Sequence, residues 1–412
     1  MDKLQLINFF KVLFGSVGGK LAGFIALPIV ASYLGPEKFG LLSVWSSLVA
    51  LVFSLMSMRF SEFLMVDYFK TDLKGFKSSI SSGFIISLGI CGFLILLVAF
   101  FSDYIENWFG FDIWWVYAGI GAAFFNWFYQ VFLALARLLN KISLYSFIDF
   151  FNHALTGFLT WFLVVMLFND WFSRVYAIYV VGIISMGVYL FFLRKNLGLN
   201  DWFAQNKYRE VISFCGPLIF HSFVPFVRLG LDKVLLVGVV SAVDLGEYSL
   251  AVTLGSTYSL ITMSLMSVIQ PSWYRNYEKN NIILISVKQY LVYTLGYLSI
   301  IFLGYFVLRV VLSAFFSGEY ESTIDYLPII SLNLLFFFIY RLLNIPLFYA
   351  QKTRSVGLGV GLILLVQIVF MISGVQYLSI MGMLYLLMFF DVIRISFLII
   401  IVRLNEEIKV IW

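Results

Sequence analysis

FCGPLIFHSFVPFVRLGLDKVLLVGVV, residues Phe214–Val240, is an apolar stretch with ionisable residues in its interior. It is long enough to cross a bilayer, which takes about 20 mostly apolar residues. On a helical wheel, His221, Arg228 and Asp232 fall within roughly 40° of one another. Pro225 lies on the same face and predicts a kink. Because an ionised side chain at the bilayer centre costs about 2.5–3.5 kcal/mol on insertion scales, this pattern predicts a polar cavity inside a helical bundle.

The whole chain has the composition of a membrane protein. Of its 412 residues, 62% are hydrophobic and only 12% are charged, whereas soluble domains have about 45–50% apolar and about 25% charged residues. The first apolar run, Phe9–Tyr33, is too long for a signal-peptide core and has Lys20 in its middle, so we interpret it as a retained helix. The two cysteines, Cys91 and Cys215, lie in apolar runs and do not indicate a disulfide framework.

Counting the apolar runs predicts an all-α integral membrane protein with about twelve transmembrane helices. The predicted spans are 9–33, 39–58, 79–101, 113–136, 145–168, 172–193, 211–240, 247–270, 283–315, 326–350, 355–374 and 380–402. The long connecting segment Arg194–Glu210 divides them into two six-helix lobes, residues 1–200 and 201–412. Similar stretches after the first and seventh helices, LGPEKFGLLSV and AVDLGEYSLAV, indicate lobes related by a pseudo-twofold axis along the membrane normal.

Loop charges predict the orientation, because Lys and Arg in short loops are retained on the cytoplasmic side. With the N-terminus inside, nearly all loop Lys and Arg residues fall inside, and only Lys38 and Arg174 fall outside. We therefore expect both termini to be cytoplasmic.

Two stretches carry a resemblance to a known family: YLGPEKFGLLSV, which follows a first helix containing Lys20, and RLGLDKVLLVGVVSAVDLGEYSLA, which begins in the seventh helix. With twelve helices in two sixes, the chain resembles the polysaccharide flippases of the multidrug/oligosaccharidyl-lipid/polysaccharide exporter superfamily. The resemblance implies MATE-like lobes around a central, often cationic cavity. It also implies transport of undecaprenyl-diphosphate-linked glycans, such as O-antigen repeat units, to the periplasmic leaflet of a bacterial inner membrane. By motif position, Asp232 and Gly246 match the family.

Three cations at membrane depth are the predicted substrate contacts. Lys20 lies in the middle of its helix, Arg228 lies in the opening stretch, and Arg341 precedes a predicted break at Asn344 and Pro346. Such a set would attract a diphosphate, which Arg grips in bidentate fashion and Lys binds as a point charge. A buried structural ion pair is the alternative at each position.

Other polar residues have two interpretations. Asn126 and Gln130 share a helix face and would either contact sugars or hydrogen-bond a neighbouring helix. Asp232 and His221 are candidate ion-coupling residues. Asp232 would either pair with Arg228 only while it is ionised, which would weaken the binding of phosphate by Arg228, or form a permanent structural ion pair with that arginine, which we call a structural clip.

The remaining membrane-depth groups favour structural roles. Asp391 and Arg394 are three residues apart and can pair on one helix. Asp149 lies near a predicted helix end. His153, close to it, is typical of a residue that hydrogen-bonds a neighbouring helix, although histidine can titrate near neutral pH.

Motifs for other chemistries are missing from the sequence. It has no phosphate-cradling GxxxxGK loop and no cluster of metal ligands. We therefore expect a protein that has no cofactor or bound metal, does not bind nucleic acid and is not an enzyme. We expect an ion-coupled antiporter that flips a lipid-diphosphate-linked glycan by alternating access, with polysaccharide polymerase and chain-length machinery as further partners. Two alternatives stay open. A drug or organic-cation exporter would need an anionic cavity, and a membrane glycan polymerase or ligase would need a longer outside loop than this chain has.

Overall fold

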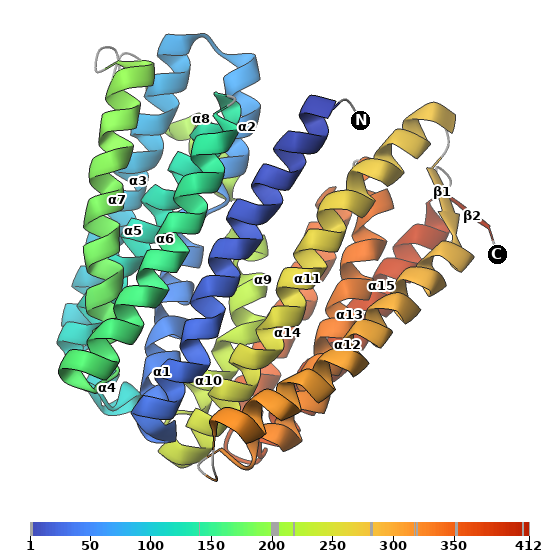
Figure 1. Cartoon of the computed structure of the whole chain (residues 1–412). Helices are drawn as coiled ribbons and strands as arrows, with labels where there is room; N and C mark the ends of the chain where they lie inside the picture. Colours follow the sequence, from blue (N-terminus) through green and yellow to red (C-terminus); the bar gives the residue numbers. More distant parts are fainter. Residues whose placement is uncertain are drawn as a thin grey trace. The chain divides into compact units, whose positions relative to one another are not determined.

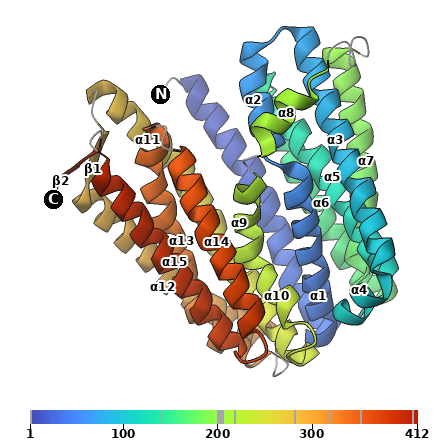
Figure 2. The same ribbon diagram turned by 180° about the vertical axis from the view of Figure 1, so that it is seen from behind.

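The chain folds almost entirely into helices. The computed structural model describes residues 3–139, 141–198, 206–216, 219–280, 283–316, 318, 320–350, 353–405 and 408–411. By their contacts, the residues form two compact units, Met1–Gly238 and Val239–Trp412, which Figures 1 and 2 show from opposite sides. The predicted lobe boundary between residues 200 and 201 lies outside the described residues and stays a prediction.

The first unit is built around one central helix. Its elements are α1 (Lys3–Ser57), α2 (Phe60–Lys70), α3 (Leu73–Phe100), α4 (Ser102–Phe109), α5 (Ile113–Leu138), α6 (Ile142–Leu163), a π-helix (Val164–Phe168), α7 (Ser173–Leu197), α8 (Tyr208–Cys215), α9 (Ile219–Leu229) and α10 (Leu231–Leu236). The central helix is α5, which packs against α1, α2, α3, α6 and α7. Trp45 of α1 is fully buried, and its indole N–H donates to the carbonyl of Trp115 at 2.8 Å. This bond ties α1 to α5. α9 and α10 also pack against α1, so the compact unit continues to Gly238.

The helix α1 contains two of the predicted crossings. At Gly35 the backbone has φ 72° and ψ 167°, a conformation that glycine adopts readily and other residues do not. Pro36 follows and lacks the N–H that a continuous helix would use. The predicted separation between spans 9–33 and 39–58 is therefore confirmed.

The opening stretch is divided among α8, α9 and α10, so the prediction of one kinked helix over 211–240 is wrong. Pro225 lies inside α9, and the interruption falls at Gly230, with φ −146° and ψ −35°. Glycine is a poor helix former. As a result Arg228 lies in the last turn of α9 and Asp232 in the first turn of α10, and their expected alignment on a single helical wheel does not apply.

The second unit is also organised around one helix. Its elements are α11 (Ala242–Asn280), β1 (Ile283–Ser286), α12 (Val287–Phe315), α13 (Thr323–Tyr349), α14 (Thr353–Gly374), α15 (Ile380–Leu404) and β2 (Ile408–Ile411). α13 packs against α11, α12 and α15. β1 and β2 pair in parallel, with Ile283 opposite Ile408. The overlong predicted span 283–315 is thus a short strand followed by a helix.

Nine helices in the described part of the chain are long and apolar enough to cross a membrane. Their outer faces carry exposed apolar side chains such as Leu96 and Phe100, 71% and 82% exposed, which suit a hydrocarbon solvent. The remaining predicted crossings correspond to the first half of α1, to α9 with α10, and to α11. The chain is an all-α, multi-pass membrane protein.

The cytoplasmic location of both termini is a prediction that fusions can test. Reporter proteins fused at Lys3, at Asn200 and after Trp412 should all report cytoplasm, because the loops on that side hold nearly all of the loop Lys and Arg residues. The measurement is the activity of a paired cytoplasmic and periplasmic reporter. A periplasmic signal at any of the three sites contradicts the topology.

Candidate functional site

A buried polar cluster joins three helices of the first unit. It consists of Tyr129 from α5, Asp149, Asn152 and His153 from α6, and Ser185 from α7, and we refer to it as the Asp149 cluster. Buried polar groups in a membrane helix are costly unless they are paired, and they mark pathways for ions or substrates. The contacts within this cluster show how the pairing is achieved.

The carboxyl group of Asp149 is the centre of the cluster. Asp149 is only 2% exposed. The Tyr129 hydroxyl donates a short hydrogen bond to its Oδ1 atom, and Nε2 of His153 lies 3.6 Å from the same oxygen. The His153 side chain is 35% exposed, so the cluster has a buried acid and a more accessible base.

The amide of Asn152 extends the cluster to α7. Its Nδ2 atom donates to Oγ of Ser185 at 3.0 Å. One turn further along α7, the buried ring of Tyr189 lies 6.3 Å from the ring of Tyr129. The side chains of the cluster therefore link α5, α6 and α7. A change at Asp149 can alter the contacts between these three helices.

This arrangement brings an acid, a hydroxyl donor and an imidazole into contact on two packed helices. Asp149 and His153 are four residues apart and lie on one face of α6. A buried carboxylate that loses its partner is strongly destabilised, so the Tyr129 hydroxyl and the His153 ring help to keep Asp149 inside the helix bundle.

α1 approaches α6 beside this acid. A Cβ atom placed on Gly19 would lie 2.6 Å from Cα of Phe150 and 3.1 Å from the carbonyl oxygen of Asp149. Only glycine allows this separation between the helices. Lys20 is the next residue of α1, and its side chain lies outside those that the structure describes.

The other two predicted cations lie in separate units. Arg228 is half-buried in the last turn of α9. Arg341 is half-buried in α13, with its guanidinium carbon 5.4 Å from the centre of the Phe337 ring, a favourable cation–π distance. Their convergence with Lys20 on one cavity stays a prediction.

The predicted glycan and coupling residues are placed but not tested by the geometry. Asn126 is exposed and Gln130 is half-buried, both on α5. Asp232 is 1% exposed at the start of α10, and its Oδ1 accepts the backbone N–H of Lys233 at 2.9 Å. The side chain of His221 lies outside the described residues.

The Asp149 cluster was not predicted from the sequence. Asp149 was expected near a helix end, but α6 begins at Ile142, which puts Asp149 about two turns inside the helix. A usable signal was present. Asp149 and His153 are four residues apart, the spacing at which an acid and a base meet on one helix face. The contribution of Tyr129 comes from another helix and has no such signal.

Comparisons with known proteins agree with this architecture. A family model described as polysaccharide biosynthesis protein matches residues 6–277. The Lsg locus putative protein 1 of Haemophilus influenzae is 23% identical over 275 residues, which is 66% of this chain and 66% of that protein.

Two solved structures are similar in fold. One is an inward-facing multidrug resistance MATE family transporter of the MOP superfamily, with a TM-score of 0.69, 13% identity and coverage of 92% of this chain and 94% of the other. The second is the lipid II flippase MurJ in an inward closed conformation, with a TM-score of 0.66, 17% identity and coverage of 95% and 87%. The chain shares the fold of these two proteins.

Proposed function

Because the chain belongs to the polysaccharide biosynthesis protein family, we propose that it flips an undecaprenyl-diphosphate-linked oligosaccharide, such as an O-antigen repeat unit, from the cytoplasmic to the periplasmic leaflet of a bacterial inner membrane. The observation that carries this proposal is the family match over residues 6–277 of a chain with many membrane-spanning helices. The fold shared with a transporter and a flippase supports it. Polysaccharide polymerase and chain-length machinery are the proposed partners.

The substrate's diphosphate would be bound by Lys20, Arg228 and Arg341, and its sugars by Asn126 and Gln130. A phosphate group suits arginine because the planar guanidinium donates two parallel hydrogen bonds. The three predicted cations at membrane depth also argue for an anionic substrate. An exporter of drugs or organic cations is the second candidate, supported by the likeness to a multidrug resistance transporter, but cations in its path would repel that cargo.

The cycle would be alternating access of the two lobes, with antiport of an ion down its gradient. Two sites could couple the ion. Asp232 with His221 is the site suggested by the sequence. The Asp149 cluster is the site suggested by the structure, because its acid, base and hydroxyl donor are in contact. We favour the Asp149 cluster on that geometry.

Reconstituted vesicles test the function directly. The purified protein is placed in liposomes with a fluorescent lipid-diphosphate-linked glycan, and a proton or sodium gradient is imposed. We expect the glycan lipid to change leaflets only in vesicles that contain the protein, and faster with the gradient. Uptake of a fluorescent organic cation in place of glycan flipping would favour the exporter.

The proposed cationic contacts give a graded prediction. Lys20→Ala, Arg228→Ala and Arg341→Ala should each lower flipping, because a hydrogen bond to a charged group contributes about 1.5–3 kcal/mol, or roughly 10- to 150-fold in affinity. Arg→Lys at 228 and 341 should restore only part of the activity, since the bidentate grip is lost. Arg403→Ala, at an exposed helix end, is the control and should flip normally. Full activity of all three alanine variants would remove this assignment.

A further inference from the structure

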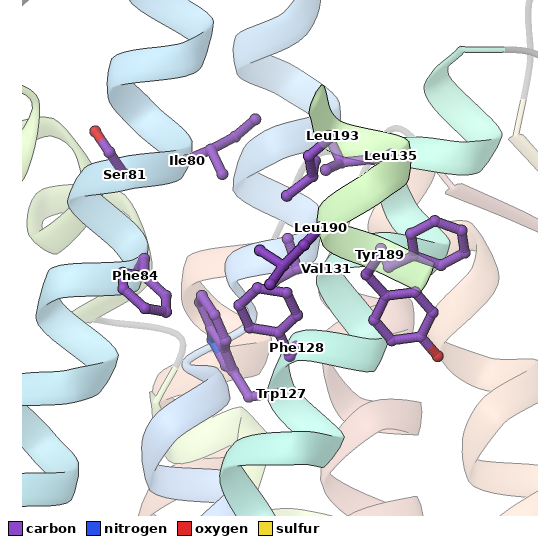
Figure 3. A pocket seen from close by; sticks show the side chains of 11 residues that line it. Ile80, Ser81, Phe84, Trp127, Phe128, Val131, Leu135, Tyr189, Leu190 and Leu193 are labelled. Atoms are coloured by element: carbon purple, nitrogen blue, oxygen red, sulfur yellow. The ribbon is translucent and has the colours of Figure 1, made fainter. Parts of the chain in front are cut away.

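An apolar pocket of about 320 Å³ lies in the first unit between α3, α5 and α7 (Figure 3). This volume is within the range of about 300–1,000 Å³ that small-molecule sites have. Aromatic rings make up much of its wall, among them Phe84, Trp127 and Phe128. Ser81 also lines it, but the Ser81 hydroxyl already donates to the carbonyl of Ser78 at 3.0 Å. The pocket therefore suits a hydrocarbon group and not a sugar or a phosphate.

The mouth of the pocket lies on an apolar face of the first unit. α3 and α7 both pack against α5, and all three helices contribute side chains to the wall of the pocket. Most of the lining is buried, but Leu190 of α7 is 49% exposed and marks the mouth. Ile183, seven residues earlier and on nearly the same helix face, is 62% exposed and apolar. A lipid chain can thus reach the mouth from the side.

The pocket lies at the depth of a single leaflet. Ile80 is seven residues after the start of α3 at Leu73, and Leu190 is seven residues before the end of α7 at Leu197. At 1.5 Å per residue, both lie about 10 Å inside the helix ends. With cytoplasmic termini these ends face the cytoplasm, so the pocket is in the inner leaflet, the leaflet in which the proposed substrate starts.

Cations lie between the pocket and this helix end. Lys77 is three residues before Ile80 and on the same face of α3. Its side chain is buried, at 7% exposed, and its Nζ atom lies 3.9 Å from the point where a Cβ atom on Gly198 would be. Arg194 is exposed and lies one turn beyond Leu190 on the same face of α7. Both cations are therefore at headgroup depth, directly beyond an apolar pocket.

We propose that this pocket binds the first isoprenoid units of the substrate's lipid tail, with the diphosphate held at Lys77 and Arg194. The inference rests on the proposed function and adds a loading site for the substrate. Hydrophobicity alone gives no selectivity here, because bilayer chains are as apolar as the lining. Selectivity comes from shape and charge together, since flat rings pack against the planar double bonds and methyl branches of an isoprenoid, and the cations attract two phosphates.

The loading site also lies next to the Asp149 cluster, with Tyr189 between them. Tyr189 forms part of the pocket wall, and Figure 3 shows its hydroxyl directed away from the pocket. Its ring is stacked on that of Phe132 at 4.2 Å and lies 6.3 Å from that of Tyr129, the hydroxyl donor to Asp149. A second pocket in this unit, between α2 and α8, has charged residues of both signs in its wall, among them Asp67, Lys70 and Arg209, and is less suited to a hydrocarbon tail.

Photolabelling tests the site without requiring transport. The purified protein in liposomes is irradiated with a polyprenyl diphosphate that carries a diazirine near the head of its tail, and labelled peptides are identified by mass spectrometry. We expect labels on α3 and α7 at the pocket. Leu190→Trp, which fills the mouth, should lower labelling at least about tenfold, the change that follows from losing 1.4 kcal/mol of affinity. Ile183→Trp is the matched control and should label as the wild type does.

Competition identifies the source of the chain. Unlabelled polyprenyl diphosphate should displace the label, whereas phosphatidylglycerol and polyprenol without phosphate should not at the same concentration. Arg194→Gln should reduce the preference for the diphosphate over the polyprenol. Equal labelling of Leu190→Trp and the wild type, or displacement by phosphatidylglycerol as good as that by the diphosphate, overturns the proposal.

The site and the proposed function can fail separately. If the protein is labelled at the pocket but flips no glycan, the result supports the loading site and contradicts the proposed function. Wild-type flipping by the Leu190→Trp variant would support the function and show that the pocket is not used for loading.

Discussion

Asp149→Asn should remove the dependence of glycan flipping on an imposed ion gradient while the protein stays folded. Asparagine has the same shape and can still accept the Tyr129 hydroxyl, but it has no charge to pair with His153. Moving one charge across the membrane is worth about 2.3 kcal/mol per 100 mV, which biases a two-state carrier roughly 50-fold. The measurement is the flipping rate in vesicles with and without the gradient, and we expect the two rates to become equal.

Asp232→Asn is the matched comparison, because Asp232 is also a buried acid of the first unit. We expect this variant to keep its gradient dependence, in which case Asp232 serves as a structural clip. Tyr129→Phe should weaken the response without removing it, since the hydroxyl donates to Asp149 but carries no charge. The opposite pattern, with Asp149→Asn responding normally and Asp232→Asn insensitive, would place coupling at the residue that the sequence suggested.

The fold could be predicted in large part because the membrane leaves a chain few options. Every backbone polar group in a bilayer core must be satisfied within the segment or its neighbours, so long apolar runs become helices. The break at Gly35 was also readable, since a Gly-Pro step ends a helix locally. The pair Asp391 and Arg394 was predicted from their spacing and is confirmed by an Nη1–Oδ1 distance of 2.5 Å.

Features that depend on partners distant in sequence could not be predicted. The seventh crossing was expected to bend at Pro225, but neighbours accommodate a proline in a membrane helix, and the interruption falls at Gly230. Strand β1 was read as part of a helix because its partner β2 is far along the chain. Tyr129 meets Asp149 only because α5 and α6 pack together, and no spacing rule connects two helices.

Arg394→Ala should destabilise the second unit by about 3–5 kcal/mol, the usual cost of breaking a buried ion pair by removing one partner. Arg394 and Asp391 are 2% and 3% exposed. Nη1 of Arg394 donates to Asp391 on α15 at 2.5 Å, and Nη2 donates a short hydrogen bond to Oε1 of Gln367 on α14. The arginine thus connects two helices, and its removal leaves a buried carboxylate and a buried amide without this donor. Thermal unfolding in detergent micelles would measure the loss.

A double substitution shows whether the pair is a structural device or part of the transport path. Replacing buried ion pairs by apolar residues of similar volume is often neutral or stabilising, so Arg394→Met with Asp391→Leu should recover most of the stability that Arg394→Ala loses. Arg403→Ala on the same helix is exposed and should unfold like the wild type. If the double variant is as stable as the wild type and flips glycan normally, the pair serves only to join α14 and α15. If it is stable but inactive, the charges themselves are needed for transport, and the structural interpretation of Asp391 and Arg394 is wrong.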